Sequence, residues 1–266
     1  MKRHPALDLL IVVVALSGRA IAQDSPLTDP EPVAVALPVP QISLKQLLPR
    51  MATDQERIWA FPVTAAHGKA WTPALAVIGA TAALIALDST DTPYFQQTSF
   101  QQAPAVHRFN HVLSGTNTVL AIAAAPVSFY VAGLVRNDSY ASQTALLAGE
   151  AVANAEIIAL VMKDLDRRMR PSEVGPNGNF SDTWFETKNR SAGGFGSFPS
   201  GHSAAAFAVA NVFAERYPKH RWVPWVAYGI AGAIGFSRVS GQAHFPSDVF
   251  LGAALGFSTS HYVVLR

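Results

Sequence analysis

The sequence predicts an all-α protein: a six-helix core bundle with a Pro-rich N-terminal extension. Two observations predict this class. Long Ala-, Leu- and Gly-rich segments recur from Trp71 to the end of the chain, and none has the period-two alternation of a half-buried strand. Half of the 266 residues are hydrophobic, which is enough to bury the core of one large domain.

The first 22 residues have the features of a signal peptide. Two basic residues precede an apolar run over residues 9–16, and residues 20–22 read Ala-Ile-Ala, the small-x-small pattern that signal peptidase accepts. We therefore expect cleavage after Ala22 and a protein of the periplasm or cell envelope. An uncleaved membrane anchor is the alternative, although the apolar run is well short of the ~20 residues that a span needs.

A Pro-rich stretch follows the signal peptide. Residues 23–50 contain six prolines, and proline is poorly tolerated in helix interiors and central strands. We expect a tether or a strap on the surface there. The domain itself is expected over residues 51–266.

Six apolar segments are predicted to be the core helices. They cover residues 71–87, 117–135, 144–162, 201–216, 222–236 and 248–265. The longest polar stretch, residues 163–198, lies between the third and the fourth, and its glycines and prolines mark it as a loop. A long loop in a compact helical domain is often functional.

Composition excludes several classes of function. The chain has no cysteine, so thiol nucleophiles, Cys-ligated zinc and disulfides are ruled out. Its 20 Lys and Arg residues against 18 Asp and Glu residues form no long basic run, which argues against nucleic acid as a partner. A local site for a small anion agrees better with this charge pattern.

The long loop opens with KDLDRRMRP, which contains the first candidate anion ligands. Lys163 and Arg170 are the cations of interest, and Pro171 ends any helix at that point. Both could converge on one anion. The alternative is a basic helix end that interacts with its own macrodipole and faces water.

The stretch GSFPSGHSAAAFA carries the second group of candidates. Ser200 follows a proline and is suited to cap a helix, and Gly201 allows another group to approach the backbone closely. The N–H groups of a first helical turn bind anions, and His202 stands at that position. A histidine beside such a site can transfer a proton near neutral pH, whereas a lone histidine is more often only a polar helix start.

The third group lies in SRVSGQAHFPSD. Arg238 offers a planar fork for phosphate oxygens. Asp248 follows His244 by four residues at a helix entrance, where it can reach one ring nitrogen and leave the other free to attack. A surface histidine and a helix-capping aspartate are the alternative for this segment in isolation.

Together, K-x6-RP, PSGH and SR-x5-H-x3-D resemble the type 2 phosphatidic acid phosphatase superfamily, which also contains bacterial acid phosphatases and vanadium haloperoxidases. The likeness covers about residues 70–265. It implies that phosphoryl oxygens are held by Lys163, Arg170, Arg238, the Ser200 hydroxyl and the Gly201 N–H. It further implies that His244, oriented by Asp248, attacks phosphorus, and that His202 protonates the leaving oxygen and then activates water. No metal or other cofactor is implied.

The expected function is therefore a metal-independent phosphatase that hydrolyses phosphomonoesters or diphosphates, of a lipid or a small molecule, through a phosphohistidine. A vanadium-dependent haloperoxidase and a non-catalytic envelope protein are the alternatives. The integral members of this superfamily cross the membrane six times, but a cleaved signal peptide followed by three crossings would leave Lys163 in the cytoplasm. We therefore expect a periplasmic protein that contacts the membrane surface, with an integral protein as the alternative.

Three other sets of residues have open roles. His107 and His111 have the i, i+4 spacing of a metal-binding pair, but no third ligand is evident. An apolar helix is interrupted by Glu150, Asn154 and Glu156. These residues could support the site or form polar contacts between helices. Aromatic residues of the long loop could form an apolar lip for a lipid tail or pack the loop down; they are Trp184, Phe185, Phe195 and Phe198.

Overall fold

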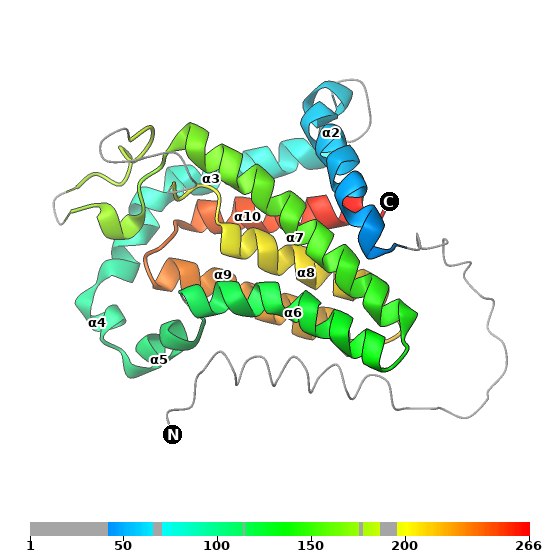
Figure 1. Cartoon of the computed structure of the whole chain (residues 1–266). Helices are drawn as coiled ribbons and strands as arrows, with labels where there is room; N and C mark the ends of the chain where they lie inside the picture. Colours follow the sequence, from blue (N-terminus) through cyan, green and yellow to red (C-terminus); the bar gives the residue numbers. More distant parts are fainter. Residues whose placement is uncertain (1–41, 66–70, 114, 176–177, 187–195) are drawn as a thin grey trace.

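The computed structural model describes residues 42–65, 71–113, 115–175, 178–186 and 196–266. The predicted signal peptide, most of the predicted tether and Phe195 lie outside these ranges. The all-α prediction is confirmed for the described residues, which form helices and turns and no strand. Their helices are α2 (Leu47–Ala65), α3 (Trp71–Gln96), α4 (Thr98–Gln101), α5 (Pro104–Leu113), α6 (Thr116–Val135), α7 (Ser139–Asp166), α8 (Gly201–Arg216), α9 (Trp222–Ser240) and α10 (Pro246–Thr259) (Figure 1).

Five of the six predicted core segments each lie in one observed helix, the sixth extends beyond α10, and the structure adds α2, α4 and α5. Helix α8 has the predicted bounds, and α10 continues into a π-helical turn over Ser260–Val264. Helix α2 begins at Leu47, inside the stretch expected to be a tether, because Pro49 lies in the first turn, where proline is tolerated. The segment predicted to end at residue 87 continues to Gln96 because Asp88, which looks like a polar end, is buried.

Helix α8 lies at the centre of the bundle between α7, α9 and α10 (Figure 1). Its alanines permit this position, since Ala204 and Ala208 are fully buried and leave room for neighbouring backbones. Glycines of α10 bring the two backbones together: a Cβ on Gly252 would lie 2.3 Å from the Ser200 carbonyl oxygen, and one on Gly256 would lie 2.0 Å from that of Ala204. This crossing holds the starts of α8 and α10 side by side.

Gly256→Ala should therefore destabilise the protein. A methyl group cannot fit 2.0 Å from a backbone oxygen, so α8 and α10 must separate, and such overpacking typically costs about 1–3 kcal/mol. Thermal unfolding in detergent should show a melting temperature lower by several degrees. Gly232→Ala in α9 is the matched control, because a Cβ there meets nothing within 4 Å and should leave the melting temperature unchanged or raise it. Equal melting temperatures for the two variants would contradict this packing.

Three helices of the described part of the chain support membrane association. Helices α3, α6 and α7 are 26, 20 and 28 residues long, and each contains an apolar stretch long enough to cross a bilayer. Many of their large apolar side chains are exposed: Leu75, Ile78 and Leu87 on α3, and Val119, Leu120, Val127, Val131 and Leu134 on α6. Helix α8 is only about 24 Å long, too short to cross a bilayer, but these three helices are longer.

The polar residues of α7 bind α2 and do not face lipid. Arg50 Nε lies 3.0 Å from Glu150 Oε1, and Asn154 Nδ2 donates a 2.9 Å hydrogen bond to Asp54 Oδ2. Glu150 and Asn154 are fully buried. Glu150 therefore does not prevent α7 from crossing a membrane, because this carboxylate is paired inside the protein.

Candidate active site

The three predicted motifs meet at one end of the bundle, where α7 and α9 end and α8 and α10 begin (Figure 1). Arg238 Nη1 lies 3.1 Å from His202 Nε2, which joins the second motif to the third. The Ser200 N–H donates a 2.9 Å hydrogen bond to the Asp248 carbonyl oxygen, which joins the same two motifs through the backbone. Residues from three distant parts of the sequence thus share one site.

His244 has a defined tautomer. Its Nδ1 lies 2.6 Å from the Ser197 carbonyl oxygen and 3.6 Å from Asp248 Oδ2. A carbonyl oxygen can only accept, so Nδ1 carries the proton and Nε2 keeps its lone pair. The ring is only 3% exposed, and burial lowers the pKa of His244 although Asp248 opposes this shift. His244 is thus a neutral imidazole with one free nitrogen.

Asp248 lies beside His244 as predicted, so its charge acts on the imidazole. The shorter hydrogen bond of His244 Nδ1, however, goes to the Ser197 carbonyl oxygen and not to Asp248. Burial alone would raise the pKa of Asp248, but His244 and Arg168 together bring it below its ordinary value. The carboxylate accepts from the Phe245 N–H at 2.8 Å and from Arg168 Nη1 at 2.6 Å. Asp248 is therefore ionised, fully buried and fixed in place beside the imidazole.

Arg168 is a site residue that the sequence did not single out. Its Nη1 reaches Asp248, its Nη2 lies 2.7 Å from Asp88 Oδ2, and its side chain is 1% exposed. The guanidinium carbon lies 4.3 Å from the centre of the Trp184 ring and 3.9 Å from that of Phe245, so two aromatic rings cover it. Arg168 connects α3, the long loop and α10 through one buried cation.

Ser197 is a second residue that sequence reasoning missed. Its N–H donates to the Arg168 carbonyl at 2.8 Å, its hydroxyl lies 2.9 Å from Asp248 Oδ2, and its carbonyl accepts from His244. Ser197 sits three residues before the predicted cap Ser200. Its serine side chain and its position beside that motif were the only available signals, since a backbone carbonyl has no signature in the sequence.

His202 is held as a neutral base next to a cation. Arg238 can only donate, so His202 Nε2 accepts from it. The Gly115 backbone forms a hydrogen bond with the other ring nitrogen of His202. Burial and the neighbouring Arg238 lower the pKa of His202 to about 3. Burial also lowers the pKa of Arg238, to about 10, which leaves Arg238 charged at neutral pH.

Anion binding should therefore be coupled to proton uptake by His202. At pH 5.5 and before an anion binds, the His202 ring is neutral, since the pKa of His202, about 3, lies below that pH. An anion on Arg238 removes the repulsion that a protonated His202 would feel, so its pKa rises toward the ordinary value and a proton binds. Calorimetry of sulfate binding in two buffers of different ionisation enthalpy should show uptake of a fraction of a proton. The uptake should vanish in His202→Gln, and equal uptake in both proteins would contradict this coupling.

The remaining predicted phosphate ligands surround the same space. Lys163 is buried and Arg170 half-buried, and among the described residues no carboxylate forms an ion pair with either. Ser200 caps α8, and its hydroxyl lies 3.4 Å from the Ser203 nitrogen. The third open polar residue of α7, Glu156, belongs to the site: a Cβ on Gly201 would lie 2.8 Å from its Oε2. Gly201 thus keeps room between a carboxyl group and the start of α8.

The loop aromatics mostly pack the loop down. Trp184 and Phe198 form an edge-to-face pair with centroids 5.1 Å apart, and Trp184 lies on Arg168. Phe185 is 70% exposed and is the one of the three described aromatics that could contact a lipid. His107 and His111 lie on α5, and the described residues hold no group of three or more His, Cys, Asp or Glu that could bind a metal ion.

Known proteins resemble parts of the chain. The chain is 38% identical over 100 residues to the lipid A 1-phosphatase of Rhizobium etli, covering 38% of this chain and 40% of that protein. It is 38% identical over 85 residues to a probable diacylglycerol pyrophosphate phosphatase 1 of Schizosaccharomyces pombe, covering 27% and 30%. The crystal structure of Aquifex aeolicus LpxE matches 69% of this chain and 93% of that one at 20% identity, with a TM-score of 0.44.

The matched stretch spans less than half the length of both curated relatives. The model of the PAP2 superfamily matches residues 144–265, a range that contains every site residue predicted from the sequence. This confirms the resemblance drawn from the three motifs, and this part of the chain belongs to the PAP2 superfamily.

Proposed function

We propose that the protein is a metal-independent phosphatase that hydrolyses phosphomonoesters or diphosphates of lipids through a phosphohistidine. The observation that carries the proposal is the state of His244: its Nδ1 proton is held by the Ser197 carbonyl, which leaves Nε2 for attack, and the cations Lys163 and Arg170 act on the ring. A neutral imidazole with one bound and one free nitrogen is suited to attack phosphorus.

In the first step His244 Nε2 attacks phosphorus as the bond between phosphorus and the leaving oxygen breaks. The bound phosphate raises the pKa of His202, so that its Nε2 holds a proton and gives it to the leaving oxygen. Arg238, which contacts His202 Nε2, would donate to the phosphoryl oxygens. The products are an alcohol or a phosphate leaving group and a phosphohistidine.

In the second step neutral His202 takes a proton from water, and the hydroxide attacks the phosphohistidine. The bond between phosphorus and His244 breaks, inorganic phosphate leaves, and both imidazoles return to their starting states. Lys163, Arg170 and Arg238 supply fixed positive charge for the phosphoryl oxygens throughout, which is the part that a metal ion plays in other phosphoryl-transfer enzymes.

The relatives support a lipid as substrate. Two of them are named for phosphatase action on lipid A and on diacylglycerol pyrophosphate. The three long apolar helices support association with a membrane. A soluble phosphoester would need neither feature.

Phosphate release from a panel of lipid phosphates and soluble phosphoesters tests the proposal. The purified protein should release phosphate from lipid phosphates in the presence of EDTA, and vanadate should inhibit it. His244→Asn should be inactive on all of them. Loss of activity on chelation that a divalent ion restores would contradict the proposal, and oxidation of halide by the vanadate-loaded protein would favour a haloperoxidase.

We further propose that the site faces the periplasm and that residues 1–22 are a signal peptide, so that the mature chain begins at Gln23.

The chain lacks cysteine, so single-cysteine variants can be labelled cleanly. Ser172→Cys lies at the site end and Leu44→Cys near the start of α2, and both positions are exposed. A membrane-impermeant maleimide should label Ser172→Cys from the periplasm. Labelling of Leu44→Cys from the same side agrees with a cleaved signal peptide, whereas labelling only after lysis indicates a spanning bundle and contradicts cleavage after Ala22. Ser172→Cys labelled only after lysis would contradict the outward site.

A further inference from the structure

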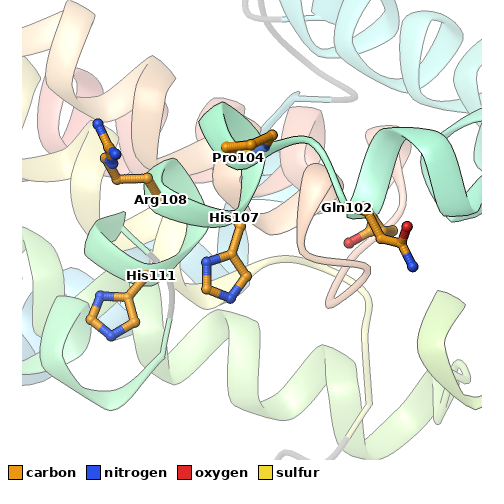
Figure 2. A pocket seen from close by; sticks show the side chains of 6 residues that line it. Gln102, Pro104, His107, Arg108 and His111 are labelled. Atoms are coloured by element: carbon orange, nitrogen blue, oxygen red, sulfur yellow. The ribbon is translucent and has the colours of Figure 1, made fainter.

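A pocket of about 500 Å³ lies beside the candidate active site on α4 and α5 (Figure 2). Its lining residues are Gln101, Gln102, Pro104, His107, Arg108 and His111. Figure 2 shows His107 and His111 projecting on the same side of α5, one turn apart, with Gln102 across from them. None of these side chains takes part in the chemistry proposed above.

The lining of the pocket is suited to an anion. It contains a guanidinium, two imidazoles and the side-chain amide of Gln102, all of which can donate hydrogen bonds, and none of the lining residues is a carboxylic acid. The amide of Gln101 already donates to the carbonyl oxygens of Phe95 and Ser240. A guanidinium matches the planar geometry of phosphate or carboxylate oxygens. His107 and Arg108 are exposed, so a ligand can enter from solvent or from the membrane surface.

Hydrogen bonds attach this pocket to the elements that carry Arg238. Gln101 Nε2 donates to the Ser240 carbonyl at 2.9 Å, and the Ser240 hydroxyl donates to Asn110 Oδ1 at 2.6 Å. The Ser237 hydroxyl lies 2.8 Å from the Leu113 carbonyl oxygen. Both serines flank Arg238 on α9, so the pocket and the phosphate site keep a fixed separation.

The chain itself limits the distance between the pocket and the candidate active site. His111 precedes Gly115 by four residues, which span at most ~14 Å of chain, and the Gly115 backbone contacts His202. A group bound at His111 can thus belong to the same molecule as a phosphate bound at His202.

An aromatic cluster joins α5, which carries much of the pocket, to its neighbours. The rings of Phe95 and Phe109 pack against Phe236 with centroids 6.3 and 5.8 Å apart, which fixes α3 and α5 to α9. Tyr94 and Phe236 are about half exposed, at 56% and 49%. The elements that carry the pocket thus also carry exposed aromatic rings, which suits contact with an amphiphile.

We propose that this pocket binds a second anionic group on the headgroup of the lipid substrate, distinct from the phosphate that is hydrolysed. The inference rests on the proposed phosphatase function. It assigns to the enzyme a preference for lipids with two anionic groups in one headgroup. The pocket takes no part in bond breaking, so its contribution is to substrate binding.

The test compares two synthetic lipids that differ in one group: a bisphosphate whose phosphates are separated by a sugar ring, and the matching monophosphate. His107→Gln combined with Arg108→Gln removes the charge from the pocket at exposed positions. The KM for the bisphosphate should rise about tenfold, with kcat unchanged and the monophosphate kinetics unaltered. Arg57→Gln, an exposed arginine of α2, is the matched control and should change neither substrate.

Each other outcome overturns the inference in a recognisable way. Equal KM values for the bisphosphate in wild type and double variant show that the pocket does not bind the headgroup. An equal rise for both lipids, which disappears when anionic carrier lipid is replaced by neutral detergent, shows that the pocket binds the membrane surface instead. If wild-type protein hydrolyses neither lipid, the proposed function has failed; in that case binding of the bisphosphate to wild type and double variant, measured by calorimetry, still tests the pocket.

Discussion

Arg168→Met should destabilise the protein by about 3–5 kcal/mol and abolish its activity. The substitution fills a similar volume but leaves Asp88 and Asp248 buried without their shared cation. Breaking a buried ion pair by removing one partner costs that much because an uncompensated charge remains inside. Activity should be lost at the same time, since Asp248 would no longer be fixed beside His244.

Thermal unfolding and folded yield in detergent measure this effect. Arg167→Met is the matched control, because the neighbouring side chain makes only a hydrogen bond to the Asp164 carbonyl at 3.1 Å and should contribute less than about 1 kcal/mol. Combining Arg168→Met with Asp88→Asn removes one of the two orphaned charges. The combination should regain part of the stability and none of the activity. An Arg168→Met variant as stable as wild type would show that this cation does not hold the site together.

The sequence was a good guide where residues act through their type and spacing. Helix α8 has its predicted bounds because Ser200 caps it and alanines follow. Each of the three motifs alone has a structural alternative, and they could be found because all three occur together, in order and with every position filled. Arg238 and His202 lie 36 residues apart in the chain, and their 3.1 Å contact follows from the meeting of α8 and α9.

The sequence was a poor guide to what supports these residues. KDLDRRMRP contains three arginines, and nothing in their order distinguishes Arg168, which is buried, from Arg167 beside it. The difference arises because Arg167 adopts a left-handed conformation, with φ of 45°, at the end of α7. Asp88 was invisible for a related reason: an aspartate in an apolar segment looks like a helix end until its partner 80 residues away is placed beside it.

Helix α2 was missed because its stabilising contacts are polar. Arg50, Asp54 and Gln55 face α7, whereas Leu48 and Trp59 are exposed. An ordinary amphipathic helix in water buries its apolar face, whereas α2 turns polar side chains toward α7 and apolar ones outward. A search for helices with an apolar buried face therefore misses α2. The same reversal agrees with a lipid environment around α2.

The two histidines should fail in different ways when each is replaced by alanine. His244→Ala should lower kcat by about 10⁴-fold or more and form no phosphoenzyme, because no other group can make the covalent bond to phosphorus. His202→Ala should still form the phosphohistidine from p-nitrophenyl phosphate, since p-nitrophenolate leaves without a proton. Its steady-state rate should fall by about 10²–10⁴-fold, because water lacks its base.

Rapid-mix kinetics and protein labelling distinguish the two variants. His202→Ala should show a burst of p-nitrophenolate followed by a slow steady state, with label that is stable in alkali and lost in acid. The burst should shrink with a substrate whose alkoxide needs protonation, because the first step then also depends on His202. The tautomer observed for His244 is the reason to expect this order of events, since its Nε2 is free before any proton moves. A phosphoenzyme that persists in His244→Ala, or equal labelling of both variants, would show that the nucleophile is another residue.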